Sequence, residues 1–313
     1  MKAGKAFELL VKYILMHIGF SEVVSDGLYV FNGTSGQMIQ GLGDAHNADV
    51  LLEPPVQTPF YTPTRLLIEC KDQFSAVGLN VVRSALGLRE DINHFDIVDV
   101  NELRARRSNR RRGIVHKHSR YMYQVAVASM SGFTVPAQNF AITHRIPLIE
   151  FDKMPFWSGF KELIDGEQRY DLPWRKYDEA NEEAIKDFAD QTAERFAVAI
   201  TNSGQMLFLY RTNGRNTEFE EKYMLYWDRK DEPWRLVSGN VQYRFQLPEY
   251  ILKQWLENSS NDLDMKINAI NCKTNYLSNM IVYYSEYGCP QIKMISIDRS
   301  QLRETLIRLK QNR

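Results

Sequence analysis

The apolar positions at the start of the chain predict an amphipathic helix. Six large apolar residues recur at helical spacing: Phe7, Leu10, Val11, Ile14, Leu15 and Ile18. Gly19 suits the C-terminal end of this helix. Glu8 lies at the edge of the apolar stripe, close to the direction of Leu15, so we expect its side chain to face a cleft beside the core. The alternative is a pair with Lys12, one turn away on the solvent face.

The apolar runs that follow predict alternating strands and helices, as in an α/β fold. The expected strands are residues 28–31, 48–52, 65–71, 123–130 and 146–151, and the expected helices are residues 80–91 and 134–144. Four prolines separate the second and third of these strands. Because no helix or central strand tolerates them, we expect a hairpin with a long, stiff connection. This part of the chain predicts a mixed central sheet flanked by helices.

The character of the sequence changes after Asp152. Residues 155–178 are rich in Trp, Pro, Tyr and charge, and we interpret them as a linker that packs against the protein. The predicted domains are therefore residues 1–154 and an α+β domain over residues 179–313. The second domain has expected helices at residues 179–188, 249–256 and 298–310, and expected strands at residues 196–201, 206–210, 224–227, 242–245, 281–284 and 292–297.

Large aromatic residues mark this second domain. They are Trp227, Trp234, Tyr243, Phe245 and Trp255. Plain core packing explains such residues. The sharper alternatives are a module that selects a feature of DNA, or a surface for self-association, and the sequence leaves these open.

The composition excludes several classes of protein. With 44% hydrophobic and 12% aromatic residues in 313, the chain can bury a sizeable core, so wholesale disorder is excluded. No apolar run approaches the roughly 20 residues that cross a bilayer, and the first residues lack the apolar segment of a signal peptide. Three scattered cysteines, Cys70, Cys272 and Cys289, predict neither a disulfide framework nor a zinc site. We therefore expect a cytoplasmic protein without a membrane partner.

A net charge of zero hides one strongly basic stretch. Residues 101–120 hold seven Arg and one Lys against Glu102, which gives 8 − 1 = +7, so the rest of the chain sums to −7. The arginines that we expect to contact phosphates in a loop are Arg104, Arg106, Arg107, Arg110, Arg111 and Arg112. The alternative is a solvated or disordered loop without a partner.

Two carboxylates and a lysine at the predicted hairpin point to metal chemistry. Glu69 and Lys71 are two apart on a strand and share a face, while Cys70 faces the layer behind. If the hairpin forms, Asp49 can lie beside Glu69. Two such carboxylates repel unless a cation lies between them, and oxygen ligands suit Mg²⁺ or Mn²⁺. The alternative is an ordinary ion pair of Glu69 with Lys71 while Asp49 caps a turn.

Three motifs in order resemble one family of nucleases. They are Gly41-Leu-Gly-Asp-Ala-His-Asn-Ala-Asp49-Val50, then Leu67-Ile-Glu-Cys-Lys71, and Ser131-Gly-Phe-Thr-Val-Pro-Ala137 followed by Ala141 and Ile146-Pro-Leu-Ile149. Together with the helix that carries Glu8, they resemble the PD-(D/E)XK nuclease superfamily, closest to the Mrr-like restriction endonucleases. The resemblance covers about residues 4–152. The loop has fewer glycines than the family pattern, and both the proline-rich connection and the arginine-rich insertion depart from it.

The resemblance implies a restriction-endonuclease-like core and a role for each matching residue. Asp49, Glu69 and the backbone carbonyl of Cys70 become metal ligands, Lys71 the catalytic lysine, and Glu8 an acid that organises metal-bound water. The implied activity is cleavage of double-stranded DNA with Mg²⁺, for which Mn²⁺ can substitute, in restriction or antiviral defence. The alternatives are a structure-selective repair or recombination nuclease and a catalytically silent DNA-binding protein. A homodimer and a partner subunit both stay open.

Overall fold

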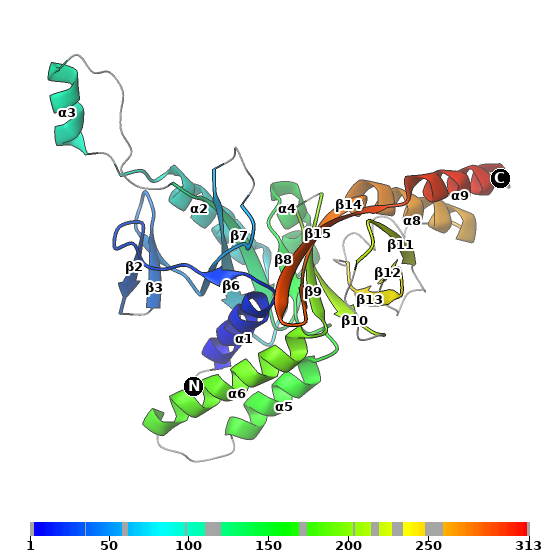
Figure 1. Ribbon diagram of the computed structural model, residues 1–313, viewed down its shortest axis with the longest axis horizontal. Helices are drawn as coiled ribbons and strands as arrows, with labels where there is room; N and C mark the ends of the chain where they lie inside the picture. Colours follow the sequence, from blue (N-terminus) through cyan, green and yellow to red (C-terminus); the bar gives the residue numbers. More distant parts are fainter. Residues whose placement is uncertain are drawn as a thin grey trace.

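The protein contains a five-stranded mixed sheet and a closed seven-stranded barrel. The computed structural model (Figure 1) describes residues 3–34, 36–57, 62–97, 99–109, 120–168, 174–202, 204–213, 219–226, 234–247 and 259–311. Among the residues that it describes, no helix is long and apolar enough to cross a membrane.

The mixed sheet with its helices confirms the α/β class predicted for the first half. Its strands run in the order β1 (Ser21–Glu22), β5 (Val50–Glu53), β6 (Thr64–Lys71), β7 (Met122–Ser129) and β8 (Leu148–Glu150). The pairs β1–β5 and β5–β6 are antiparallel, whereas β6–β7 and β7–β8 are parallel. The helices near this sheet are α1 (Ala3–His17), α2 (Leu79–His94) and α4 (Val135–His144). As expected, α1 ends before Gly19, which adopts a φ of 108°.

Alternation along the strands separates two hydrophobic layers. Leu66 and Ile68 pack in the same cluster as α1, while Leu67 packs with α2 and α4 on the other face. Both faces of the central strands are therefore buried, which explains the continuous apolar runs in the sequence.

A small antiparallel sheet stands between α1 and the hairpin in the sequence. It consists of β2 (Val30–Gly33), β3 (Gly36–Gln40) and β4 (Ala45–Asn47). The strand expected over residues 28–31 begins two residues later than predicted. The sheet ends shortly before Asp49, so it positions the chain that enters β5.

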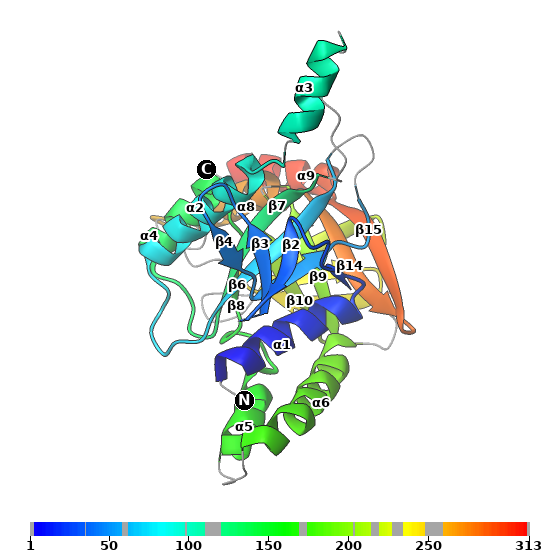
Figure 2. The same ribbon diagram turned by 90° about the vertical axis from the view of Figure 1, so that its left-hand side faces the viewer.

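The first part of the arginine-rich stretch is a helix, which corrects the expected loop. Helix α3 (Val100–Ser108) begins at Asp99, whose carboxylate accepts hydrogen bonds from the backbone N–H groups of Asn101 and Glu102. None of its residues is buried. Figures 1 and 2 show it projecting away from the rest of the molecule. Residues 110–112 lie outside the described part of the chain.

The second half forms a closed barrel, whose closure the strand pattern alone does not predict. The barrel order is β10 (Met206–Arg211), β13 (Val241–Phe245), β12 (Trp234–Ser238), β11 (Lys222–Tyr226), β15 (Cys289–Ile297), β14 (Asn279–Glu286) and β9 (Phe196–Thr201), which pairs again with β10. Helices α8 (Asp262–Tyr276) and α9 (Arg299–Gln311) accompany it. Trp234, Tyr243 and Phe245 are buried in its core, as the packing alternative predicts. Trp227, Trp255 and the helix expected at residues 249–256 lie outside the described residues.

The stretch interpreted as a linker is largely helical. It contains α5 (Trp157–Gln168) and the start of α6 (Trp174–Ala193), which packs beside α1 (Figure 2). Trp157 and Phe160 are buried in one cluster with Phe7 and Phe151. The same cluster includes Phe196 and other outward-facing side chains of β9 and β10. One core therefore runs across the boundary predicted at residue 154.

Candidate active site

The hairpin brings the predicted site residues to adjacent strand ends. Val50 pairs with Ile68, and the same register places Asp49 opposite Glu69. The backbone N–H of Cys70 donates a hydrogen bond of 2.9 Å to Asp49 Oδ2. The expected pairing of these two segments is therefore confirmed, and the Asp49 carboxylate is held against the strand that carries Glu69.

The two faces of β6 separate the charged side chains from the thiol. Cys70 packs against the cluster that includes α1, whereas Leu67, which shares a face with Glu69 and Lys71, belongs to the opposite cluster. Lys71 Nζ lies 2.8 Å from Glu69 Oε2, and both side chains are half-buried. Burial opposes the charged form of Lys71, but its hydrogen bond to Glu69 and the charges of Glu69 and Asp49 outweigh it. The pKa of Lys71 is therefore raised.

The surroundings of Asp49 disfavour a negative charge on its carboxylate. Burial is the largest cause that raises its pKa; the Cys70 N–H opposes the rise, and the charges of Glu8 and Glu69 add to it. Asn47 Nδ2 donates to the other oxygen, Oδ1, at 3.2 Å. Neighbouring N–H groups thus orient both carboxylate oxygens of Asp49. The negative charges of Glu8 and Glu69 oppose its ionisation.

Glu8 lines a cleft, as its position at the edge of the apolar stripe predicts. The cleft has a volume of about 140 Å³ and lies between α1 and the start of β5, with Asn47 and Asp49 also in its wall. Glu8 Oε2 pairs with Lys5 Nζ at 2.9 Å, and Lys12 pairs instead with Glu22 at 2.8 Å. The alternative pair of Glu8 with Lys12 is therefore not formed.

A histidine–aspartate pair anchors the glycine-containing loop before Asp49. His46 Nε2 lies 2.6 Å from Asp91 Oδ2, and the Gly43 N–H donates to Asp91 Oδ1 at 2.9 Å. The hydrogen bond to His46 and then that to Gly43 lower the pKa of Asp91. A Cβ atom at Gly41 would collide with the backbone carbonyl oxygen of Asp44 as well as with the side chains of Asp91 and His46, which favours glycine there. The loop is thereby fixed to α2.

The donors at this site suit a hard cation with few protein ligands. The described residues contain no group of three or more His, Cys, Asp and Glu side chains arranged for a metal. The set predicted here needs only the carboxylates of Asp49 and Glu69 and the backbone carbonyl of Cys70. Mg²⁺ is commonly held by one or two carboxylates while waters complete its shell. Burial first, and then the charges of Glu8 and Glu69, raise the pKa of Asp49, so its negative charge is only partly compensated by the protein's own groups.

The predicted phosphate-binding arginines divide into two groups. Arg104 and Arg107 are exposed on α3, and Arg106 Nε pairs with Glu102 Oε1 at 3.3 Å. Arg110, Arg111 and Arg112 lie outside the described residues. The described part of the site therefore presents positive charge on a helix that stands clear of the sheet (Figure 2).

Several residues near the site were missed from the sequence. Asn47 could have been found, because it lies two positions before Asp49 and so tends to share its face. The His46–Asp91 pair joins residues 45 apart, which no local pattern predicts. Phe74, three residues beyond Lys71, is fully exposed at 109%.

Comparisons with known proteins do not assign this chain to a family. No family model matches the chain, and no relative is found among curated proteins. Among solved structures, one described as "Crystal Structure of Protein of Unknown Function AF1548" matches with 13% identity, covering 61% of this chain and 96% of that chain, at a TM-score of 0.33. A likeness at this level carries no weight for fold or function.

Proposed function

We propose that this protein is a Mg²⁺-dependent endonuclease that hydrolyses phosphodiester bonds of double-stranded DNA in restriction or antiviral defence. The observation that carries the proposal is the hydrogen bond from the Cys70 N–H to Asp49 Oδ2, because it joins the two acidic strand ends of the hairpin beside Lys71. On the resemblance to PD-(D/E)XK nucleases, and on the mixed sheet, we also propose a restriction-endonuclease-like core.

The surroundings of each side chain support its proposed role. Asp49, Glu69 and the carbonyl of Cys70 would hold Mg²⁺, which polarises the phosphodiester and acidifies a bound water. Because the pKa of Lys71 is raised, its side chain stays an ammonium. In that form it can stabilise the charge that grows on the phosphate oxygens or hold the attacking water. Glu8, in the cleft with Asp49, can accept a hydrogen bond from the attacking water and orient it.

The protruding arginines support a nucleic-acid substrate. Guanidinium groups bind phosphates in a planar fork, and contacts of this kind add affinity without reading sequence. Helix α3 has no buried residue, and the interactions that support its conformation are the Asp99 cap and the pair of Glu102 with Arg106. We propose that the arginines of α3 bind backbone phosphates of a duplex whose scissile bond lies at Asp49 and Glu69.

A cleavage assay with three substrates tests this function. Supercoiled plasmid, linear duplex and a four-way junction are incubated with the protein, with Mg²⁺ or with EDTA. We expect Mg²⁺-dependent cleavage of plasmid and linear duplex. Asp49→Ala and Glu69→Ala should each abolish it while DNA affinity and the circular dichroism spectrum stay close to those of the wild type.

Glu304→Ala is the matched control, because it removes one exposed carboxylate on α9, away from the sheet. It should cleave like the wild type. Wild-type rates in either site variant would overturn the assignment of the site. Cleavage of the junction alone would identify a structure-selective nuclease instead. Tight DNA binding without cleavage by the wild type would identify a catalytically silent DNA-binding protein.

A further inference from the structure

A short loop follows the last residue of β6 and carries one fully exposed aromatic ring. It comprises residues 72–76, directly after Lys71, and Phe74 at its centre is 109% exposed. Burial of a phenyl ring in the core stabilises a fold, and this ring makes no such contribution. In the segment from Lys71 to Gly78, all of which the structure describes, Phe74 is the one large apolar side chain that is exposed.

Hydrogen bonds hold the backbone on the far side of this ring. The carbonyl of Ser75 accepts hydrogen bonds from Gln73 Nε2 at 2.8 Å and from Ser131 Oγ at 2.6 Å. The backbone N–H of Val77 then donates to the carbonyl of Gly132 at 2.9 Å, and the Val77 side chain is completely buried. Because the loop is already ordered between β6 and this anchor, it loses less conformational entropy when the ring engages a partner.

The loop lies at the edge of the sheet that carries the candidate active site. Phe74 follows Lys71 by three residues, so their Cα atoms are at most roughly 11 Å apart. A Cβ atom at Gly4 would lie 3.8 Å from Asp72 Cβ, so the loop also lies beside the first turn of α1, one turn before Glu8. A duplex whose scissile phosphate lies at Lys71 and Glu8 therefore comes within reach of the Phe74 ring.

A single isolated ring suits a wedge between base pairs better than a protein interface. A stable protein interface buries about 800 Å² on each partner. The residues on either side of Phe74 are the polar Gln73 and Ser75, so the loop offers no continuous apolar patch. A wedge needs only one apolar side chain, and phenylalanine is among the residues that proteins insert between base steps. These observations favour a nucleic-acid duplex as the partner of the ring.

We propose that Phe74 inserts between neighbouring base pairs of the bound duplex and unstacks them beside the scissile phosphate. Successive base pairs are roughly 3.4 Å apart, so a reach of roughly 11 Å places the unstacked step within about three base pairs of that phosphate. Unstacking bends the duplex and brings more of its backbone against the protein. Phe74 is thus a positioning residue, which sets where the phosphate lies relative to Lys71. The inference rests on the proposed function, since its partner is the duplex bound at Asp49 and Glu69.

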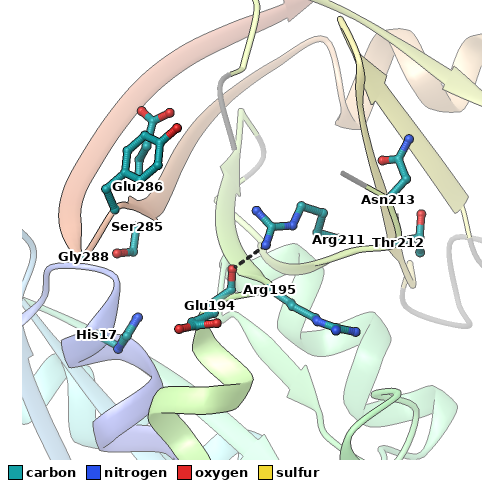
Figure 3. A pocket seen from close by; sticks show the side chains of 10 residues that line it. His17, Glu194, Arg195, Arg211, Thr212, Asn213, Ser285, Glu286 and Gly288 are labelled. Carbon is teal, nitrogen blue, oxygen red and sulfur yellow. Dashed lines mark hydrogen bonds between the residues drawn. The ribbon is translucent and has the colours of Figure 1, made fainter. Parts of the chain in front are cut away.

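The barrel offers a matched control in Tyr287, another strongly exposed aromatic residue. Tyr287 is 91% exposed and lies in the turn between β14 and β15, where Glu286 and Gly288 border a polar cavity of about 540 Å³ at the mouth of the barrel (Figure 3). His17, near the end of α1, lines the same cavity. It lies roughly 20 Å along the helix from Gly4, which is next to the Phe74 loop.

Tryptophan fluorescence of the full chain tests the insertion without requiring cleavage. Phe74→Trp keeps a flat ring in the loop, and subtraction of the wild-type emission isolates the tryptophan that the substitution introduces. Saturating linear duplex in EDTA should quench most of this emission, because the ring stacks against bases. Tyr287→Trp in the same titration should show no such quenching. Both positions are exposed, so the variants should fold.

Single-turnover cleavage of plasmid with Mg²⁺ tests the positioning role. Phe74→Ala should cleave roughly tenfold more slowly than the wild type, the loss expected for one contact between a base and an aromatic ring. Phe74→Trp should restore the rate, because it restores the ring. Tyr287→Ala should cleave like the wild type.

The outcomes separate this inference from the proposed function. Emission of Phe74→Trp that duplex leaves unchanged, or equal quenching in Tyr287→Trp, would overturn the insertion. So would wild-type binding and cleavage by Phe74→Ala. If the wild type cleaves duplex in these cases, the nuclease assignment stands without the wedge. Selective quenching of Phe74→Trp by a duplex that the wild type does not cleave would instead support the inserted ring and overturn the nuclease activity.

Discussion

The sheet presents charged side chains at its strand ends, whereas the interior of the barrel is filled by large aromatic and apolar side chains. The sheet is open, and its strands β5 and β6 present half-buried acids and a lysine where they meet. The barrel is closed, and its interior is filled by Trp234, Tyr243 and neighbouring apolar side chains. An open sheet exposes strand ends on which a reactive group can be built, whereas a filled barrel leaves only its mouth and its outer wall for binding.

The outer wall of the barrel completes the core of the other region. On β9, Phe196 and Val198 face the cluster that includes α1, while Ala197 and Ala199 face the barrel interior. The barrel thus supports the sheet by packing, and among the described residues the charges that shift the pKa of Asp49 come from Glu8, Glu69 and Lys71.

Lys71→Ala should have the largest effect, because it removes a charge that acts mainly in the transition state. We expect the cleavage rate to fall by roughly 10²–10³-fold, as for the loss of one transition-state donor, with little change in DNA affinity. Cys70→Ser, on the opposite face of the same strand, should cleave at nearly the wild-type rate. Single-turnover kinetics on plasmid DNA measure both. Equal losses would mean that the two faces of β6 are exchanged relative to this structure.

Leu236→Ala should separate stability from chemistry. Leu236 is completely buried in the barrel, so truncation should lower the free energy of unfolding by roughly 2–5 kcal/mol. Urea unfolding followed by tryptophan fluorescence measures the loss. The cleavage rate per folded molecule, at a temperature where the variant stays folded, should be unchanged. A parallel fall in that rate would show that the barrel shapes the site directly.

Replacing exposed arginines of α3 should change binding but not stability. For Arg104→Ala with Arg107→Ala, each lost phosphate contact should reduce the slope of log affinity against log salt by roughly 0.9. The same is expected when Arg110, Arg111 and Arg112 are replaced. The melting temperature should barely move, since α3 buries no residue. A slope identical to that of the wild type would exclude these side chains from the DNA interface.

The smallest effect concerns the charge of Asp49 itself. Its pKa is raised by burial and by Glu8 and Glu69, so the ionised form weakens the metal-free fold at neutral pH. Asp49→Asn should therefore unfold at higher urea than the wild type in EDTA at pH 7. The difference should shrink as the pH falls through the raised pKa toward the ordinary value of 3.8, because the wild-type carboxyl then becomes neutral. Lower stability of the variant at pH 7 would contradict the repulsion inferred here.

Local periodicity predicted the parts of the fold that depend on short-range order. The stripe from Phe7 to Ile18 gave α1, and the two apolar runs around the prolines gave the β5–β6 hairpin. The same register placed Asp49 near Glu69. Polar helices were harder to recognise: α3 has no apolar face to bury, and α5 and α6 begin in a stretch whose Trp and Pro content resembles a loop.

Features that depend on distant pairing could not be read from the sequence. The His46–Asp91 pair and the cavity at the barrel mouth each need the complete fold, and the closure of the barrel depends on which strands meet. Strand β12 shows the limit in detail. Its side chains alternate between buried and half-buried from Trp234 to Ser238. Because the strand is only five residues long, this alternation is a weak indication of a strand in the sequence.

The closure of the barrel has a consequence for the order of folding. Strand β15 joins β11 in parallel, with Lys222 opposite Ser296, and also pairs with β14. Until the ribosome has made β15, both of those neighbours have unpaired edges, which are templates for aggregation. The barrel therefore cannot close before β15 has been translated, and a long-range parallel pairing of this kind is slow to form. Chains halted before Cys289 should depend on chaperones, while the sheet that carries Asp49 has by then all of its own strands.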